Sequence, residues 1–288
     1  MRRYGILALL GLWLAVSNAW ATENLKPFIM ISDSAGDAAA AVADTKSRLE
    51  AGGFKVVGEY SPYAGSNVIV VTSDALLGQA AKSKFGGYGS VIRVSVTQAG
   101  DNVQVAYANP DYWAEAYQME SLGEVSAALS AALGEGTAYG SKEGLSEKKL
   151  RKYHYMAFMP YFKDHDELGE FGSHAEAVAA VNKQLGSNTN GLNKVFEVAL
   201  PGKDETLIGV GISQGEGADS YVMERVDKAE MKHTAHLPYA VLVSGNNVYS
   251  LAGKFRIALS FPDLTMGTFG SIMSSPGAIK DSLGTLAK

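Results

Sequence analysis

The stretch HLPYAVLVSGNNVYSLAGKFRIALSFPD, from His236 to Asp263, decides the predicted fold. It contains an apolar strand, a Gly-Asn-Asn turn, a second long strand and a terminating Pro-Asp pair. Turns of the Asn-Gly type between β-rich runs are the strongest short-range signal for a hairpin. A looser copy, YGSVIRVSVTQAGDNVQVAYANPD, runs from Tyr88 to Asp111 in the same order. The sequence therefore predicts two copies of one unit.

The elements around the two hairpins recur in the same order. The first unit is predicted to carry strands at 27–32, 54–60 and 67–72, helices capped by Asp33-Ser34 and Ser73-Asp74, and helical segments at 112–117 and 123–133. The second is predicted to carry strands at 155–160, 194–200 and 206–213, helices beginning near Ser173 and Ala218, and helical segments after Pro262. This order predicts an α+β fold of two tandem two-layer units, each with helices packed on a mainly antiparallel sheet.

The beginning of the chain has the features of a secretory signal peptide. Arg2 and Arg3 give a basic start, an uncharged run follows from Ile6 to Val16, and Ala19-Trp20-Ala21 supplies a small-x-small cleavage site. The apolar run is too short to span a bilayer comfortably. We therefore expect cleavage after Ala21 and a periplasmic or secreted protein without a stable membrane anchor.

Composition divides the rest of the chain. Residues 134–152 are polar, charged and rich in glycine, which is typical of an exposed connection. The predicted organisation is a signal peptide at 1–21, a first α+β unit at 22–135, a linker at 136–152 and a second, divergent α+β unit at 153–288.

Charge and cysteine content exclude several classes of site. Without its leader the chain has 23 basic and 30 acidic residues, and this acidity disfavours nucleic acid and anionic lipid as partners. The chain has no cysteine, which rules out structural disulfides, thiolate metal sites and covalently attached haem.

Two stretches of the first unit carry a resemblance to a known family. They are GGFKVV at 52–57 and VQVAYANPDYWAEAY at 103–117, and with the elements around them the first unit resembles the "domain of unknown function 302" family over roughly residues 27–135. The resemblance implies a compact two-layer α/β fold, frequent occurrence in bacteria, no established activity and no agreed catalytic residues. The second unit departs from it by its longer hairpin and its histidines.

The second unit contains all five histidines and six of the nine methionines. The sharpest group is Met231-Lys232-His233-Thr234-Ala235-His236, in which His233 and His236 can face one way on a helical turn. Thioether and imidazole ligands suit copper or haem iron, so Met223, Met231, His233 and His236 form a hypothetical metal site. The structural alternative is that the methionines fill a core and that His236 caps the entry to a strand.

Other side chains have a structural and a functional interpretation. Tyr107, Tyr112, Trp113 and Tyr117 are a candidate pocket lining, although aromatic residues near a hairpin are more often core. Arg256 lies in a predicted strand and is expected to face solvent or to pair with an acidic residue.

No recognisable catalytic motif occurs in the sequence. It has no G-x-S-x-G elbow, no P-loop and no H-E-x-x-H. The preferred hypothesis is a periplasmic, non-enzymatic module that binds an unknown small molecule or an envelope protein. The alternatives are a copper or haem-iron protein, an accessory subunit of an envelope complex, and an enzyme with His236 as general base beside Asp263 or Glu230.

Overall fold

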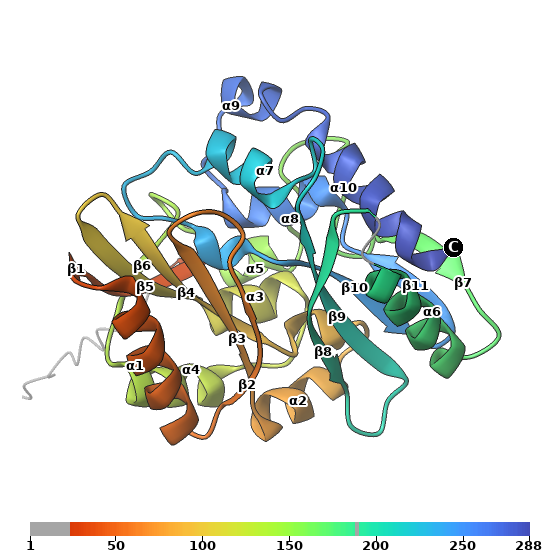
Figure 1. Cartoon of the computed structure of the whole chain (residues 1–288), viewed down its shortest axis with the longest axis horizontal. Coiled ribbons are helices and arrows are strands. Elements are labelled where there is room, and N and C mark those ends of the chain that lie inside the picture. The colour runs from red at the N-terminus through yellow and green to blue at the C-terminus, as the bar shows by residue number, and fades with distance from the viewer. Residues whose placement is uncertain (1–23, 188–189) are drawn as a thin grey trace, which may run out of the picture.

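The computed structural model describes residues 24–187 and 190–288, so the predicted signal peptide and its cleavage site lie outside the described residues. The fold is α+β, as predicted, with helices around two antiparallel sheets (Figure 1). No helix within the described ranges is long and apolar enough to cross a membrane.

The first sheet has six strands in the order β2-β3-β4-β5-β1-β6. These are β2 (Lys55–Tyr60), β3 (Ser66–Thr72), β4 (Ile92–Ala99), β5 (Asn102–Ala108), β1 (Phe28–Ala35) and β6 (Thr137–Tyr139). The helices that accompany them are α1 (Ala38–Ala51), α2 (Asp74–Ala81), η1 (Gly86–Gly89), α3 (Pro110–Ala116), α4 (Gly123–Leu133) and α5 (Glu147–Leu150).

The second sheet has five strands in the order β7-β11-β10-β9-β8. These are β7 (Asp166–Glu170), β11 (Asn247–Ser250), β10 (Tyr239–Ser244), β9 (Glu205–Ile212) and β8 (Leu192–Ala199). The remaining helices are α6 (His174–Ser187), α7 (Asp219–Val226), η2 (Thr234–His236), α8 (Gly253–Ser260), α9 (Met266–Gly270), α10 (Ser275–Gly284) and η3 (Thr285–Ala287).

The two sheets share a strand order. Numbered in chain order within its unit, the second strand is followed across each sheet by the third, fourth, fifth and first. The first strand of each unit has an extra residue in its pairing, at Ile31 and Leu168, and the second strand has one at Val57 and Val195. β-Bulges are local features of a strand pair, so their matched positions extend the likeness beyond strand order. Descent from one duplicated unit stays a prediction.

Several capping residues are as predicted. Ser73 accepts a hydrogen bond from Leu76 N and begins α2, and Ser173 accepts one from Glu176 N at the start of α6. The predicted cap of α1 was wrong, because β1 continues to Ala35 and Asp37 is the residue that accepts from Ala40 N.

The predicted long strand after Asn247 was wrong. β11 ends at Ser250, and helix α8 contains the following apolar run, including Phe255, Arg256 and Ile257. Nearly every residue of α8 is buried, so it lacks the polar stripe that distinguishes a surface helix from a buried strand. Pro110 begins α3 after β5, whereas Pro262 follows helix α8. The two prolines therefore do not occupy equivalent positions in the two units.

The strand predicted at 155–160 was also wrong. Met156 and Phe158 in this segment are exposed, and the first strand of the second sheet is β7 instead. Apolar composition suggested the strand, but no sheet receives these side chains.

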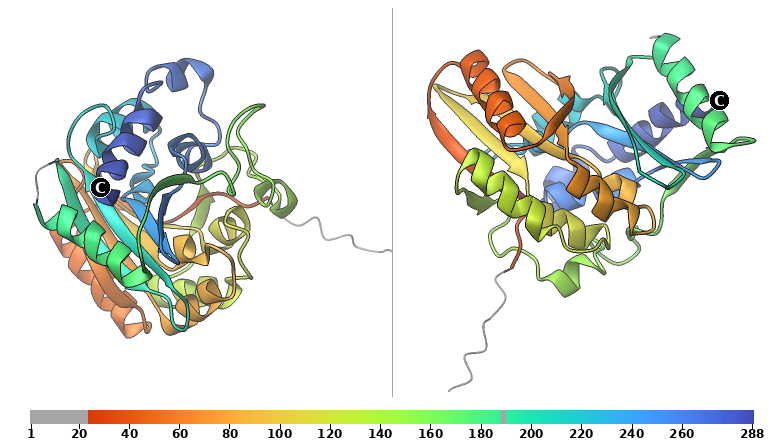
Figure 2. Two further views of the ribbon diagram at one scale, coloured as in Figure 1. Left: turned by 90° about the vertical axis from the view of Figure 1, so that its right-hand side faces the viewer. Right: turned by 90° about the horizontal axis from the view of Figure 1, so that it is seen from below.

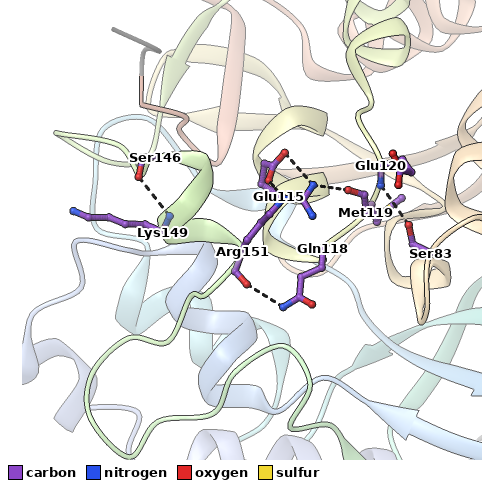
Figure 3. Close-up of polar contacts among 8 residues, drawn as sticks. All are labelled: Ser83, Glu115, Gln118, Met119, Glu120, Ser146, Lys149 and Arg151. Atoms are coloured by element: carbon purple, nitrogen blue, oxygen red, sulfur yellow. Dashed lines mark hydrogen bonds and ion pairs between the residues drawn. The ribbon is translucent and has the colours of Figure 1, made fainter.

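Residues 136–152, predicted as a linker, contain β6 and α5 and are attached to the first unit. β6 pairs with β1. Arg151 forms an ion pair with Glu115, its Nη2 donates to Met119 O at 2.8 Å, and Gln118 Nε2 donates to Arg151 O at 3.0 Å (Figure 3).

The two units share one hydrophobic core. Helices α1 and α6 lie on the outer sides of the two sheets, toward opposite ends of the molecule (Figures 1 and 2). The inner side of the second sheet, including Phe196, Leu207 and Leu242, belongs to the same buried cluster as Val94 and Trp113 of the first unit. A separate cluster lies beneath α6 and α10. Each unit therefore depends on the other for part of its burial.

Two connections cross from one unit to the other. The first strap, residues 82–91, joins α2 to β4, and Phe85 N and Gly87 N donate to the Glu205 carboxylate of β9 at 3.2 and 3.0 Å. The second strap, residues 227–238, joins α7 to β10 and lies against β3, β4 and β5. The contact between the units is thus reciprocal, since each lays a strap on the other's sheet.

Candidate functional site

The second strap is held by polar side chains of the first sheet. Gln104 donates to Glu230 O at 3.0 Å and accepts from Lys232 N at 2.9 Å. Tyr139 donates to Lys232 O at 2.6 Å, and Thr97 donates to Thr234 Oγ1 at 2.8 Å. These bonds fix the segment that the sequence singled out for its histidines.

A pocket of about 380 Å³ lies beside this strap, at the junction of the two units. Its walls from the first unit are the β2–β3 turn and the end of β4, and its walls from the second unit are α7 and the strap. The lining residues are Tyr63, Ala64, Thr97, Gln98, Ser220, Met223, Glu224, Asp227 and Lys232. Concave sites between units are common positions for ligands.

Asp227 gives the pocket its unusual electrostatics. Its Oδ2 accepts from His233 N at 2.9 Å, while its Oδ1 is buried with no hydrogen-bond partner among the described residues. Burial raises the pKa of this carboxyl to about 7, against the opposing effects of the His233 N–H and Lys232. A carboxyl that titrates near neutral pH in a pocket is a recognised sign of a functional site.

A second buried carboxyl, Asp219, lies where β2 meets the second sheet. It accepts from Tyr60 of the first unit at 2.6 Å and from Ile212 N at 3.0 Å. Gly211 leaves room for this contact, because an added Cβ would lie 2.5 Å from Tyr60 Cζ. Burial raises the pKa of Asp219 to about 7.

This raised pKa makes stability depend on pH. Because the folded carboxyl keeps its proton to a higher pH than the unfolded one, its contribution is fully present below pH 4 and is lost as pH rises through 7. The parent protein should lose about 4 kcal/mol of unfolding free energy from this group between pH 4 and pH 8, the equivalent of a pKa raised by about three units. Asp219→Asn should not lose it, so the variant should gain that amount relative to the parent as pH rises.

Urea unfolding of both proteins across this range measures the difference. Asp101→Asn, a change in an exposed turn, is the control and should differ from the parent by a constant amount. A constant difference for Asp219→Asn as well would show that this carboxyl is already ionised at pH 4 in the folded protein.

The structure places the hypothetical metal ligands in different surroundings, although the rings of His233 and His236 both contact Phe261. His233 lies between Phe28, Tyr139 and Phe261 and borders a cavity of about 190 Å³. Met223 lines the junction pocket instead, and Met231 is partly exposed.

His236 is fully buried and has a hydrogen-bonding partner for each ring nitrogen. Nδ1 lies 2.7 Å from Ser260 Oγ, and Nε2 lies 3.1 Å from the Tyr239 hydroxyl. No group of three or more histidine, cysteine or acidic residues within the described ranges is arranged to hold a metal. Copper or haem binding therefore stays a prediction, with His233 and Met223 on different cavities.

Neither acid proposed to assist His236 is shown in contact with its ring. Asp263 accepts from Lys142 N at 2.7 Å and from Ser141 Oγ at 3.2 Å, whereas His236 is fully buried and Glu230 is exposed. Burial, with Arg256 and Arg93 nearby, holds the pKa of His236 well below its usual range. The imidazole is therefore neutral at physiological pH.

Sequence reasoning missed Asp227 and Tyr63 and misplaced Arg256. An aspartate after a helix is an ordinary surface residue, and no local pattern indicates that a strap buries it. Arg256 is buried in α8 and forms no ion pair with an acid of the described ranges; its guanidinium lies 4.6 Å from the centre of the Trp113 ring. Tyr107, Tyr112, Trp113 and Tyr117 are all buried in the shared hydrophobic core, in line with the core interpretation.

Comparison with known proteins gives no relative from which a site can be transferred. No family model, curated protein or solved structure matches the chain, and the likeness to the "domain of unknown function 302" family stays a prediction.

Proposed function

We propose that this protein is exported to the periplasm and binds a small organic molecule in the junction pocket. The signal-peptide features of residues 1–21 support export. The observation that carries the binding proposal is the Asp227 carboxyl in a pocket of about 380 Å³ that both units line.

The lining favours a molecule with an apolar body and a cationic amine. Tyr63, Ala64 and Met223 offer apolar surface. Of the charged groups, Glu224 and Asp227 are acidic and Lys232 is basic, and the Lys232 ammonium already donates to Ala229 O at 2.8 Å. An ammonium group near Asp227 would also lower the pKa of that carboxyl, so binding and ionisation would favour each other.

Benzylamine and benzyl alcohol are matched probes for this proposal, because they share a ring and differ in charge. We expect benzylamine to shift the NMR signals of residues around the pocket, and benzyl alcohol to bind at least tenfold more weakly at pH 8. Asp227→Asn should abolish the preference for the amine, because the carboxylate is its source.

A blocking variant tests the location. Ser220 is exposed at the pocket wall, so Ser220→Trp should fill the pocket and prevent binding. Ser274→Trp, at an exposed serine outside the lining whose hydroxyl caps no helix, should bind like the parent. Equal binding by both tryptophan variants, or none by the parent, would refute the proposal and favour the predicted role as an accessory envelope subunit.

A further inference from the structure

One face of the molecule combines exposed lysines with exposed apolar side chains. A hollow of about 650 Å³ opens beside α5. Three lysines line it, Lys148, Lys149 and Lys152, and no acidic side chain of the described residues does. All three lysines are exposed, and none forms an ion pair within the described ranges. The hollow is therefore a local basic patch on a chain whose net charge is −5.

Helix α5 is attached to the first unit in a way that leaves these lysines free. Leu150 is buried, and the ion pair between Arg151 and Glu115 holds the end of the helix. The Lys149 side chain extends away from these contacts (Figure 3). Arg151 therefore serves the attachment of α5, while the three lysines are available to a ligand.

The loop after α5, residues 154–161, presents the apolar side chains. Its two ends meet, because the ring centroids of His154 and Tyr161 lie 4.5 Å apart. Between these ends Phe158 is fully exposed, and Met156 is 42% exposed. Phe158 follows His154 by only four positions, and His154 also lines the hollow. The apolar tip of the loop and the lysines therefore belong to one surface.

The position of Phe158 is unfavourable for the isolated protein in water. Its ring loses the free energy that burial would provide. Its φ of 66° lies in the left-handed region, which bulky residues rarely adopt. An exposed aromatic ring beside basic side chains is the combination by which proteins bind at a membrane interface.

We propose that this face binds peripherally to a membrane surface that contains anionic phospholipid. The three lysines contact the headgroup phosphates, while Phe158 and Met156 insert at the boundary between headgroups and acyl chains. The apolar tip favours a lipid surface over an acidic protein segment, because a fluid boundary accepts a single ring without a complementary pocket. The overall acidity of the chain does not prevent the contact, since physiological salt screens exposed charges beyond about 8 Å.

Cosedimentation with vesicles tests the proposal on the intact protein. Mixed vesicles of phosphatidylglycerol and phosphatidylcholine should bind at least about tenfold more tightly than phosphatidylcholine vesicles, because each lysine near an anionic surface contributes about fivefold. Added salt should weaken this binding. Equal binding to both kinds of vesicle, or binding to neither, would overturn the proposal. Binding of polyglutamate without binding of vesicles would overturn it in favour of an acidic protein partner.

Charge variants assign the binding to this face. Lys149→Gln combined with Lys152→Gln should weaken binding to the phosphatidylglycerol vesicles at least about tenfold. Lys82→Gln combined with Lys183→Gln is the matched control, because it makes the same change in net charge at exposed lysines outside the hollow. This control should bind like the parent. An equal loss in both double variants would show that net charge alone governs binding and would refute the assignment.

Phe158→Trp reports insertion directly. Trp113, the only other tryptophan after the predicted cleavage site, is buried, so a blue shift of the emission on adding anionic vesicles would come from the substituted site. Phe158→Ser should weaken binding about tenfold, while Met231→Ser, which alters a partly exposed methionine of the second strap, should not. An unshifted emission together with full binding by Phe158→Ser would show that the tip stays outside the membrane and would refute the proposal.

Discussion

Glu205→Ala is expected to lower the free energy of unfolding by about 3–5 kcal/mol, the usual cost of breaking a buried charged network from one side. The Glu205 carboxylate is buried and accepts from Phe85 N and Gly87 N of the first strap. It also lies 3.0 Å from the Lys203 ammonium. Alanine would leave both strap N–H groups without their acceptor and the ammonium with only the Ser83 carbonyl.

Denaturant unfolding measures this loss, and two further variants interpret it. Glu205→Gln keeps one acceptor oxygen and should lose about half as much stability as alanine. Glu59→Ala removes a partly exposed carboxylate paired with Lys46 and should cost no more than about 1 kcal/mol. A Glu205→Ala protein as stable as the Glu59→Ala protein would mean that the first strap is held by apolar contacts alone.

Gly58→Ala is expected to lower the free energy of unfolding by about 2–4 kcal/mol, because it forces apart the strands at which the two sheets meet. Gly58 lies on β2 against β8. An added Cβ would lie 2.3 Å from Val195 O and 3.0 Å from Phe196 Cβ. The first of these atoms belongs to the backbone, so a side-chain rotation cannot relieve the overlap.

Gly78→Ala is the matched control for this substitution. Gly78 lies inside α2, and an added Cβ there meets nothing within 4 Å. Alanine at this site should therefore raise stability by about 0.5–1 kcal/mol. Comparable destabilisation of both alanine variants would remove the support for tight packing between β2 and β8.

Local chemistry was sufficient to predict much of each unit. The serine caps of α2 and α6, the Gly-rich turns and the alternating strands depend on neighbours in the sequence. Helix α8 was missed because burial on all sides erases the polar stripe of its period.

The junction between the units depends on distant residues and could not be predicted. Arg93, Ser95 and Thr97 alternate with Ile92, Val94 and Val96 along β4, a pattern typical of a strand with one solvent face. Both sets are buried, because the second unit covers the polar side. Gln104 and Glu205 were likewise indistinguishable from surface residues, since the strap residues that they bind lie more than 100 positions away.

The reciprocal straps have a consequence for assembly. Two identical units exchanging such connections would form an isologous dimer, whose association depends on protein concentration. Joining the two units in a single polypeptide removes the dependence of their association on protein concentration. It also lets the two contacting surfaces differ in sequence. Ser66 begins β3 on one side, whereas Glu205 begins β9 on the other. Covalent fusion thus permits an asymmetric interior that a symmetric pair of separate chains cannot have.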